Sequence, residues 1–188
     1  MEQKKRLVIG VSGASGVILA EKILLALKQI SDIETHLVIS DSAALTWKYE
    51  VGSPITDLTD LADYYYTNQD ISAPIASGSF STYGMIVIPC SMKTVAGIAN
   101  GYSDNLLLRA ADVAMKEHRR ITLVVRETPF SSIHLRNMFE LSKFGVTILP
   151  AVMTFYNAPH SIDDLCNSII MKALDTLEIE NSIGNRWK

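Results

Sequence analysis

Apolar residues along this chain fall into short, nearly continuous runs, separated by longer segments in which they recur every three or four positions. The runs are typical of strands buried on both faces of a sheet, and they cover residues 7–11, 35–39, 84–88, 121–125 and 146–149. The recurring positions predict helices at about 16–30, 42–50, 92–100 and 104–117, from about 132, and at about 162–177. Ser161 and Asp164 have the spacing of a capping box for the last helix. Pro89 should close the third strand, because proline is disfavoured in a strand interior.

The alternation of strands and helices predicts the fold class. Parallel strands joined by right-handed crossovers leave helices on both faces of a sheet. We therefore expect a single domain over residues 1–188, with a doubly wound, Rossmann-like or flavodoxin-like α/β fold and a mainly parallel sheet. The segment 52–80 has a mixed pattern that predicts no element. Ligands of such folds bind at the carboxyl ends of the strands, near the switch in strand order.

Composition narrows the classes of partner. Hydrophobic residues make up 48% of the chain and charged residues 20%, and the net charge is −3. That composition is globular and provides no basic field for nucleic acid or an anionic membrane. Cys90 and Cys166 stand in unrelated contexts, which favours a reduced, cytoplasmic setting without a disulfide framework. The four histidines lack ligand spacing, so no metal is expected, and no apolar stretch has the length of a signal peptide or membrane span.

A glycine-rich segment, residues 10–16, follows the first predicted strand. Glycines allow a tight turn, and the next helix offers unpaired amides and a positive dipole end to an anion. The alternative is a tight turn without a ligand. Val11 stands where the dinucleotide pattern G-x-G-x-x-G needs glycine, and no Gly-Lys dipeptide of a P-loop occurs. We therefore expect neither NAD nor a P-loop nucleotide at this segment.

Two further polar segments follow predicted strands. The hydroxyls of Ser91 and Thr94 stand at the start of a predicted helix, where the local amides again favour an anion. Arg126 suits phosphate recognition and Glu127 suits proton transfer, although a solvated loop pair is the alternative. Cys90 has no evident partner base, so an inert buried thiol is expected there.

Two other patterns indicate a site less strongly. Arg109, Asp112 and Lys116 share one face of a predicted helix, which is more typical of a solvated surface than of a site. Tyr156 follows Phe155 after the last strand, a position typical of core or interface packing, with a phosphate contact as the alternative.

Taken in order, these segments resemble the UbiX/Pad-type flavin prenyltransferases over nearly the whole chain. The matching segments are residues 12–16, 34–40, 77–80, 84–94, 109–113, 126–130, 134–138, and 155–156 with Pro159. Members of this family join a dimethylallyl group from dimethylallyl phosphate to reduced FMN, at the flavin N5 nitrogen and then at the neighbouring ring carbon, without a metal. The resemblance implies that the product, prenylated FMN, passes to a UbiD/Fdc-type decarboxylase. It also implies a homo-dodecamer with flavin sites at subunit contacts.

The resemblance further implies which residues form the site. By position, FMN would be contacted by Gly13, Ala14, Ser15, Ser40, Ser91, Met92, Lys93, Thr94 and Arg126. The prenyl phosphate would be held by Tyr156 and Lys172, and the charged active-site residues would be Glu50, Lys116 and Glu127. Cations at Lys116, Arg126 and Lys172 would stabilise the departing phosphate. Glu127 and Ser15 would relay a proton lost from the flavin.

Two positions and two alternatives complete the sequence-based picture. Lys172 replaces the arginine that family members often carry, which keeps the charge but loses the bidentate fork. Trp187 matches a tryptophan near the family's C-terminus. One alternative is an FMN-dependent cysteine decarboxylase-like flavoprotein, whose P-x-M-N-x-x-M-W-type segment does not follow Pro150. The other is a non-enzymatic FMN storage or delivery subunit of an aromatic acid decarboxylase, which would not need Lys116, Glu127 and Lys172 together.

Overall fold

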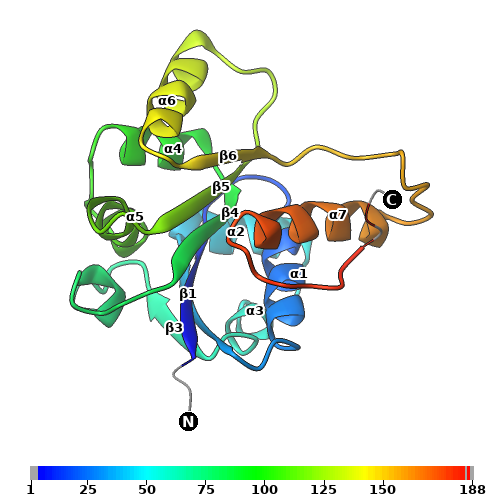
Figure 1. The fold of residues 1–188 in the computed structure, drawn as a ribbon, viewed down its shortest axis with the longest axis horizontal. Coiled ribbons are helices and arrows are strands. Elements are labelled where there is room, and N and C mark those ends of the chain that lie inside the picture. The colour runs from blue at the N-terminus through cyan, green and yellow to red at the C-terminus, as the bar shows by residue number, and fades with distance from the viewer. Residues whose placement is uncertain (1–3, 185, 187–188) are drawn as a thin grey trace.

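A six-stranded parallel sheet crosses the centre of the computed structural model, which describes residues 4–184 and residue 186 (Figure 1). Trp187 and the first three residues lie outside the described residues. The strands are β1 (Lys5–Val11), β2 (Ile33–Ile39), β3 (Tyr64–Thr67), β4 (Gly84–Cys90), β5 (Arg120–Val125) and β6 (Thr147–Pro150). Their order, β3-β2-β1-β4-β5-β6, is that of Rossmann folds and reverses between β1 and β4. The predicted doubly wound α/β class is therefore confirmed.

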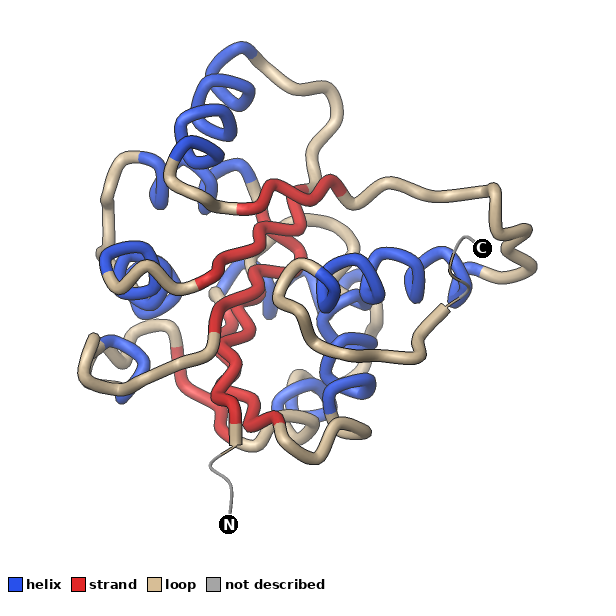
Figure 2. Tube along the Cα trace, in the orientation of Figure 1, coloured by secondary structure: helices blue, strands red, loops and turns tan. Residues whose placement is uncertain are grey.

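Helices cover both faces of this sheet (Figures 1 and 2). The helical elements are α1 (Ile18–Leu27), α2 (Asp41–Glu50), α3 (Thr56–Thr59), the 3-10 helix η1 (Pro74–Ala76), α4 (Met92–Ala99), α5 (Leu106–Lys116), α6 (Ser132–Lys143) and α7 (Ile162–Asp175). Side chains of α1, α2 and α7 pack in one hydrophobic layer, and side chains of α4, α5 and α6 pack in the other. The predicted capping box of α7 is present, because Ser161 Oγ accepts from the Asp164 N–H and the Asp164 side chain accepts from the Ser161 N–H. None of the described helices is long and apolar enough to cross a membrane.

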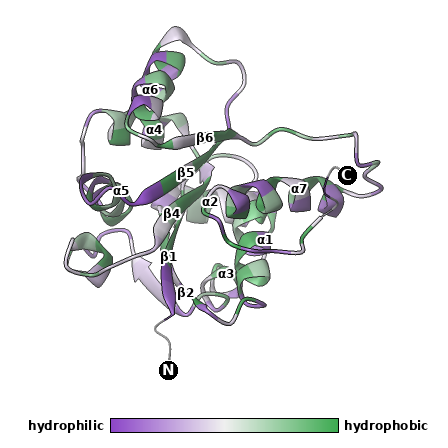
Figure 3. Cartoon of the chain, in the orientation of Figure 1, coloured by the Kyte–Doolittle hydropathy of each residue, from purple (hydrophilic) through white to green (hydrophobic). Residues whose placement is uncertain are grey.

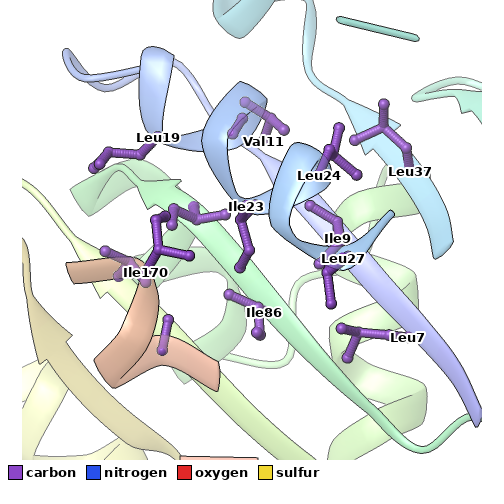
Figure 4. Packing of buried hydrophobic residues seen from close by; sticks show 14 of the residues in the cluster. Leu7, Ile9, Val11, Leu19, Ile23, Leu24, Leu27, Leu37, Ile86 and Ile170 are labelled. Carbon is purple, nitrogen blue, oxygen red and sulfur yellow. The ribbon is translucent and has the colours of Figure 1, made fainter. Parts of the chain in front are cut away.

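Successive residues of each central strand point to opposite layers, which explains the nearly continuous apolar runs. Leu7 and Ile9 of β1 belong to the layer of α1, and Val8 belongs to the layer of α5. Figure 4 shows the first of these layers, where Leu7 and Ile9 lie on the side of Leu27 of α1, and Ile86 of β4 lies toward Ile23 of the same helix. In Figure 3 the central strands β4 and β5 are coloured largely hydrophobic. A strand buried on both faces can carry apolar side chains throughout, which is why these strands were predictable.

The sequence pattern did not predict β3. This strand is Tyr-Tyr-Tyr-Thr at the edge of the sheet, and Tyr64 and Tyr65 remain 49% and 45% exposed. Its partner strand holds it through His36, whose ring stacks on Tyr64 at 4.9 Å between centroids and whose Nδ1 lies 2.9 Å from the Tyr66 hydroxyl. Burial lowers the pKa of His36, and its Nε2 bonds the Glu34 carboxylate over 2.9 Å. The strand is stabilised by these tertiary contacts and not by burial of an apolar run, so the hydrophobic pattern of the sequence does not predict it.

The expectation that Pro89 ends the third strand was wrong. β4 continues to Cys90, and its pairing with β5 shifts register between Val87 and Cys90. Proline is tolerated at such an irregularity because the regular ladder no longer requires its N–H. The Pro89 carbonyl accepts instead from the N–H of Ser12 over 3.2 Å.

We predict that Leu24 and Leu25, adjacent on α1, differ sharply in their effect on stability. Leu24 is 0% exposed and Leu25 is 46% exposed. Leu24→Ala should lower the free energy of unfolding by about 3 kcal/mol through the cavity it leaves, whereas Leu25→Ala should change it by less than about 0.5 kcal/mol. Urea unfolding followed by circular dichroism measures both, and equal losses would contradict the packing described for α1.

Candidate functional site

The loops after β1, β2, β4 and β5 lie at one edge of the sheet, around the point where the strand order reverses. A small pocket opens on this side of the sheet, between the segments after β2, β3 and β4 and the start of α5. Its lining residues come from four segments: Ser40, Ser42, Asn68, Ser91, Lys93, Thr94, Asn105, Leu107 and Leu108. The structure therefore brings together Ser40, Ser91, Lys93 and Thr94 of the predicted site, although they are far apart in the sequence.

Three helices begin at this pocket, and each has its N-cap residue in the lining. Ser40 Oγ accepts from the Ala43 N–H at the start of α2 over 3.1 Å, and Ser91 Oγ accepts from the Thr94 N–H at the start of α4 over 3.4 Å. The N-cap of α5 is Asn105. Helix N-termini carry partial positive charge, and Lys93 adds a cation. The pocket is therefore suited to an anion.

Asn68 and Asn105 belong to this pocket and were missed by the sequence reasoning. The backbone carbonyl of Asn68 accepts from the Leu106 N–H over 2.8 Å, and its Oδ1 accepts from the Leu107 N–H over 3.1 Å. Asn105 Oδ1 accepts from the Leu108 N–H over 3.1 Å. The first amides of α5 are thus bonded inside the protein. Asn105 stands at the start of the helix predicted at about 104–117 and has N-cap chemistry, which could have identified it. Asn68 follows the unpredicted strand β3 and carried no such signal.

The glycine-rich loop after β1 approaches the start of α2 closely. A Cβ atom on Gly13 would lie 2.5 Å from both Cβ and Oγ of Ser42, so only glycine fits there. Gly16 has a φ of 96°, which lies in the left-handed region that favours glycine. Within this loop Ala14 is buried and Ser15 is exposed.

Glu50 occupies the N-terminus of α1. Its Oε2 accepts from the Gly16 N–H over 2.8 Å and from the Val17 N–H over 3.1 Å. The sequence predicts an anion at this helix start, and in this structure the anion is a carboxylate of the chain itself. The pocket at the starts of α2 and α4 is therefore the better place for an external phosphate.

Arg126 and Glu127 lie at the same edge of the sheet, directly after β5. The backbone N–H of Arg126 donates to the Cys90 carbonyl over 3.1 Å, and the residue is exposed. Glu127 is half-buried, and its Oε1 accepts from the Thr128 N–H over 3.0 Å. Cys90 is fully buried, and burial raises the pKa of its thiol. The thiol therefore stays protonated and is no nucleophile, as the sequence indicated.

Lys116 does not join these residues within one chain. It is the last residue of α5, just before β5 begins, whereas Glu127 follows the other end of that strand. Six strand residues span about 20 Å, so Lys116 lies beyond the amino end of β5 and Glu127 lies beyond its carboxyl end, on opposite sides of the sheet along the strand direction. The Lys116 ammonium pairs with the Glu117 carboxylate, which lowers the pKa of Glu117.

Tyr156 and Lys172 are also set apart from the pocket. Tyr156 lies in the segment 151–161 between β6 and α7, which stands out from the body of the molecule (Figures 1 and 2). We call this segment the arm. Its exposed apolar residues include Val152, Met153 and Phe155, which are 59%, 60% and 67% exposed. Lys172 is exposed on α7. Among residues 4–184 and 186, no group of His, Cys, Asp and Glu side chains gathers as metal ligands would.

Comparison with known proteins decides the family. The Flavoprotein family matches residues 1–174. A relative from Sedimentibacter hydroxybenzoicus, named a probable UbiX-like flavin prenyltransferase, is 51% identical over 183 residues, which is 97% of each chain. The flavin prenyltransferase LpdB of Lactiplantibacillus plantarum is 50% identical over 98% of each chain. The chain belongs to the flavin prenyltransferases. The predicted resemblance is therefore confirmed, and this flavin prenyltransferase is an enzyme of the prenyltransferase class.

Solved structures agree with this family at the level of the whole chain. The structure of AnUbiX (PadA1) in complex with FMN and dimethylallyl pyrophosphate is 45% identical and has a TM-score of 0.96, covering 99% of this chain and 98% of that one. A dodecameric FMN-dependent UbiX-like decarboxylase from Escherichia coli O157:H7 is 45% identical and has a TM-score of 0.94, covering 97% of this chain and 98% of that one.

We predict that Gly13→Ala destabilises this flavin prenyltransferase by about 1–3 kcal/mol, because the added methyl group overlaps Ser42. Ser42→Gly removes the two closest atoms, so the double variant should recover part of the lost stability. Urea unfolding of both single variants and the double variant measures the coupling. Additive effects of the two substitutions would show that the close approach of Gly13 to Ser42 has no energetic consequence.

Proposed function

We propose that this chain binds reduced FMN and joins to it a dimethylallyl group from dimethylallyl phosphate, giving prenylated FMN for a UbiD-type decarboxylase. The observation that carries the proposal is the pocket where α2, α4 and α5 begin beside Lys93, because it offers a phosphate site at the strand-order switch. The two ligands bound by AnUbiX support the choice of flavin and of a dimethylallyl donor.

The residues of the pocket fit the phosphate end of FMN. Ser40, Ser91 and Thr94 supply hydroxyls, and the first turns of α2 and α4 supply amides. The flavin ring would then lie along the glycine-rich loop, where Gly13, Ala14 and Ser15 follow β1, toward Met92 and Arg126. Among the described residues that line the pocket, none is a carboxylate that would repel the phosphate.

Reduced FMN, when bound, supplies the electron-rich ring atoms that accept the dimethylallyl group. The chain's task is to stabilise the phosphate that leaves the allylic carbon and to move protons. Arg126 lies at the flavin edge with its side chain exposed, and Lys172, Lys116 and the Tyr156 hydroxyl would bind the departing phosphate. Glu127 is half-buried beside Arg126 and would accept a proton, with Ser15 as the relay.

Glu50 has a different role in this arrangement. Its carboxylate is already held by the Gly16 and Val17 amides, so it fixes the loop that carries Ser15. It therefore acts through the position of that loop and keeps the start of α1 closed to phosphate.

The site would be completed by other copies of the chain. Lys116 stands at the opposite edge of the sheet from Glu127 in one chain, so it would serve the site of a neighbour. The exposed apolar side chains of the arm, of α6 and of its C-cap residue would be covered in such an assembly; Ile133, Phe139 and the C-cap Phe144 are 58%, 62% and 71% exposed. We infer a homo-dodecamer, the assembly of the relative from Escherichia coli O157:H7.

The remaining predictions fit the same proposal. The single sheet supports one flavoprotein domain over residues 1–188. The net charge of −3 favours small-molecule partners over nucleic acid. The free, buried thiols of Cys90 and Cys166 favour a reducing, cytoplasmic location.

We predict that the protein converts FMN to a heavier flavin. Anaerobic incubation with reduced FMN and dimethylallyl phosphate, followed by mass spectrometry of the extracted flavin, should show one added five-carbon unit. A parallel reaction with dimethylallyl pyrophosphate compares the two donors. Binding of FMN without any heavier flavin from either donor would overturn the transferase and favour FMN storage or delivery instead.

We predict that subunits with different lesions complement each other. Lys116→Met and Glu127→Gln should each abolish most turnover, because each removes a charged group of the same composite site. Co-expressed and purified as mixed oligomers through two affinity tags, they should recover about a quarter of wild-type activity, since random assembly pairs an intact Lys116 with an intact Glu127 in that share of sites. Activity no higher than in the single variants would contradict a site shared between copies.

A further inference from the structure

Ser12 carries a buried hydroxyl that has no part in the proposed chemistry. The residue follows β1 and is 1% exposed. Its Oγ donates to the Pro89 carbonyl over 3.0 Å and accepts from the Ser91 N–H over 2.7 Å. Its backbone N–H donates to the same Pro89 carbonyl over 3.2 Å. A buried hydroxyl is stable only when such bonds are made, and here both of them cross from the end of β1 to the end of β4.

These bonds lie beyond the regular ladder between the two strands. β1 and β4 pair from Leu7 with Gly84 to Gly10 with Val87, and the pairing of β4 with β5 becomes irregular between Val87 and Cys90. The Ser12 hydroxyl therefore holds Ser91 against β1 where the ladder between these strands has ended.

Ser91 in turn shapes the wall of the phosphate pocket. It is the N-cap of α4, and its Oγ accepts from the Thr94 N–H over 3.4 Å and lies 3.2 Å from Thr94 Oγ1. Ser91 thus links the two features, because its amide bonds Ser12 and its hydroxyl, with that of Thr94, lines the pocket. Ser12 itself is not among the lining residues.

We propose that Ser12 is a positioning residue for FMN, which sets the place of Ser91 and Thr94 and thereby the preference of the pocket for a flavin that carries a phosphate. The inference rests on the proposed role of this pocket as the phosphate site of FMN. We expect a selective consequence, because loss of the hydroxyl removes the bond to the Ser91 amide, whereas the backbone N–H of Ser12 still bonds the Pro89 carbonyl and holds the loop that faces the ring.

The test compares FMN with riboflavin, which has the same ring system and ribityl chain without the phosphate. Dissociation constants for both are measured by quenching of flavin fluorescence in the wild type, Ser12→Ala and Ser12→Thr. We expect Ser12→Ala to weaken FMN binding about tenfold and to change riboflavin binding by less than about twofold. Ser12→Thr restores a hydroxyl and should restore the preference for FMN.

Thr122→Val is the matched control. Thr122 is also 1% exposed, and its hydroxyl lies 2.7 Å from that of Thr176, in the part of β5 away from the pocket. The valine variant should lose stability without changing the ratio of the two dissociation constants. A merely structural role for Ser12 would give the same result as this control.

The outcomes separate this inference from the function on which it rests. A wild type that binds FMN no better than riboflavin would overturn the phosphate pocket and the inference together. A wild type that prefers FMN, with the same ratio in Ser12→Ala, would overturn the role of Ser12 alone. If Ser12→Ala does not fold, Ser12→Cys replaces it, because a thiol forms only weak hydrogen bonds. The ratio of the dissociation constants for riboflavin and FMN is then compared between Ser12→Cys and the wild type in the same way.

Discussion

Both faces of the parallel sheet have to be covered, because the central strands carry apolar side chains on both sides. Val8 and Leu7 of β1 belong to different layers, and so do Val38 and Leu37 of β2. This requirement puts a helix after nearly every strand and returns the chain across the sheet in the same direction each time. It also gathers the loops that follow β1, β2, β4 and β5 at the carboxyl ends of the strands. Those loops carry Gly13, Ser40, Ser91 and Arg126, and the candidate site is their meeting point.

Helix N-termini, more than charged side chains, make this site suited to a phosphate. Its net charge is −3, and Lys93 is the one cation lining the described pocket. Four helices begin near this edge, but their amides are used differently. Glu50 takes the first amides of α1, and Asn68 takes those of α5. At the starts of α2 and α4 the N-cap hydroxyls of Ser40 and Ser91 take one amide each and themselves line the pocket. Hydrogen bonds from remote segments therefore leave these two helix starts available to a ligand.

One chain holds only part of the charged machinery. The same crossover that buries β5 places Lys116 before the strand and Glu127 after it, at opposite edges of the sheet. The arm leaves the body of the molecule with Phe155 and Met153 exposed. Both features favour a site assembled between copies, in which the apolar arm is buried and the distant cations are brought to the flavin.

The sequence by itself determined the strands and helices whose burial leaves a periodic pattern, and with them the fold class. It also determined the local chemistry of Ser91, Arg126 and Glu127, because each directly follows a buried strand. Only the tertiary structure decided the edge strand β3, the continuation of β4 through Pro89, and the capture of the α1 amides by Glu50. It likewise decided that Asn68 and Ser12 act on helices distant in the sequence. These features depend on single hydrogen bonds between remote segments, and such bonds leave no periodicity in the chain.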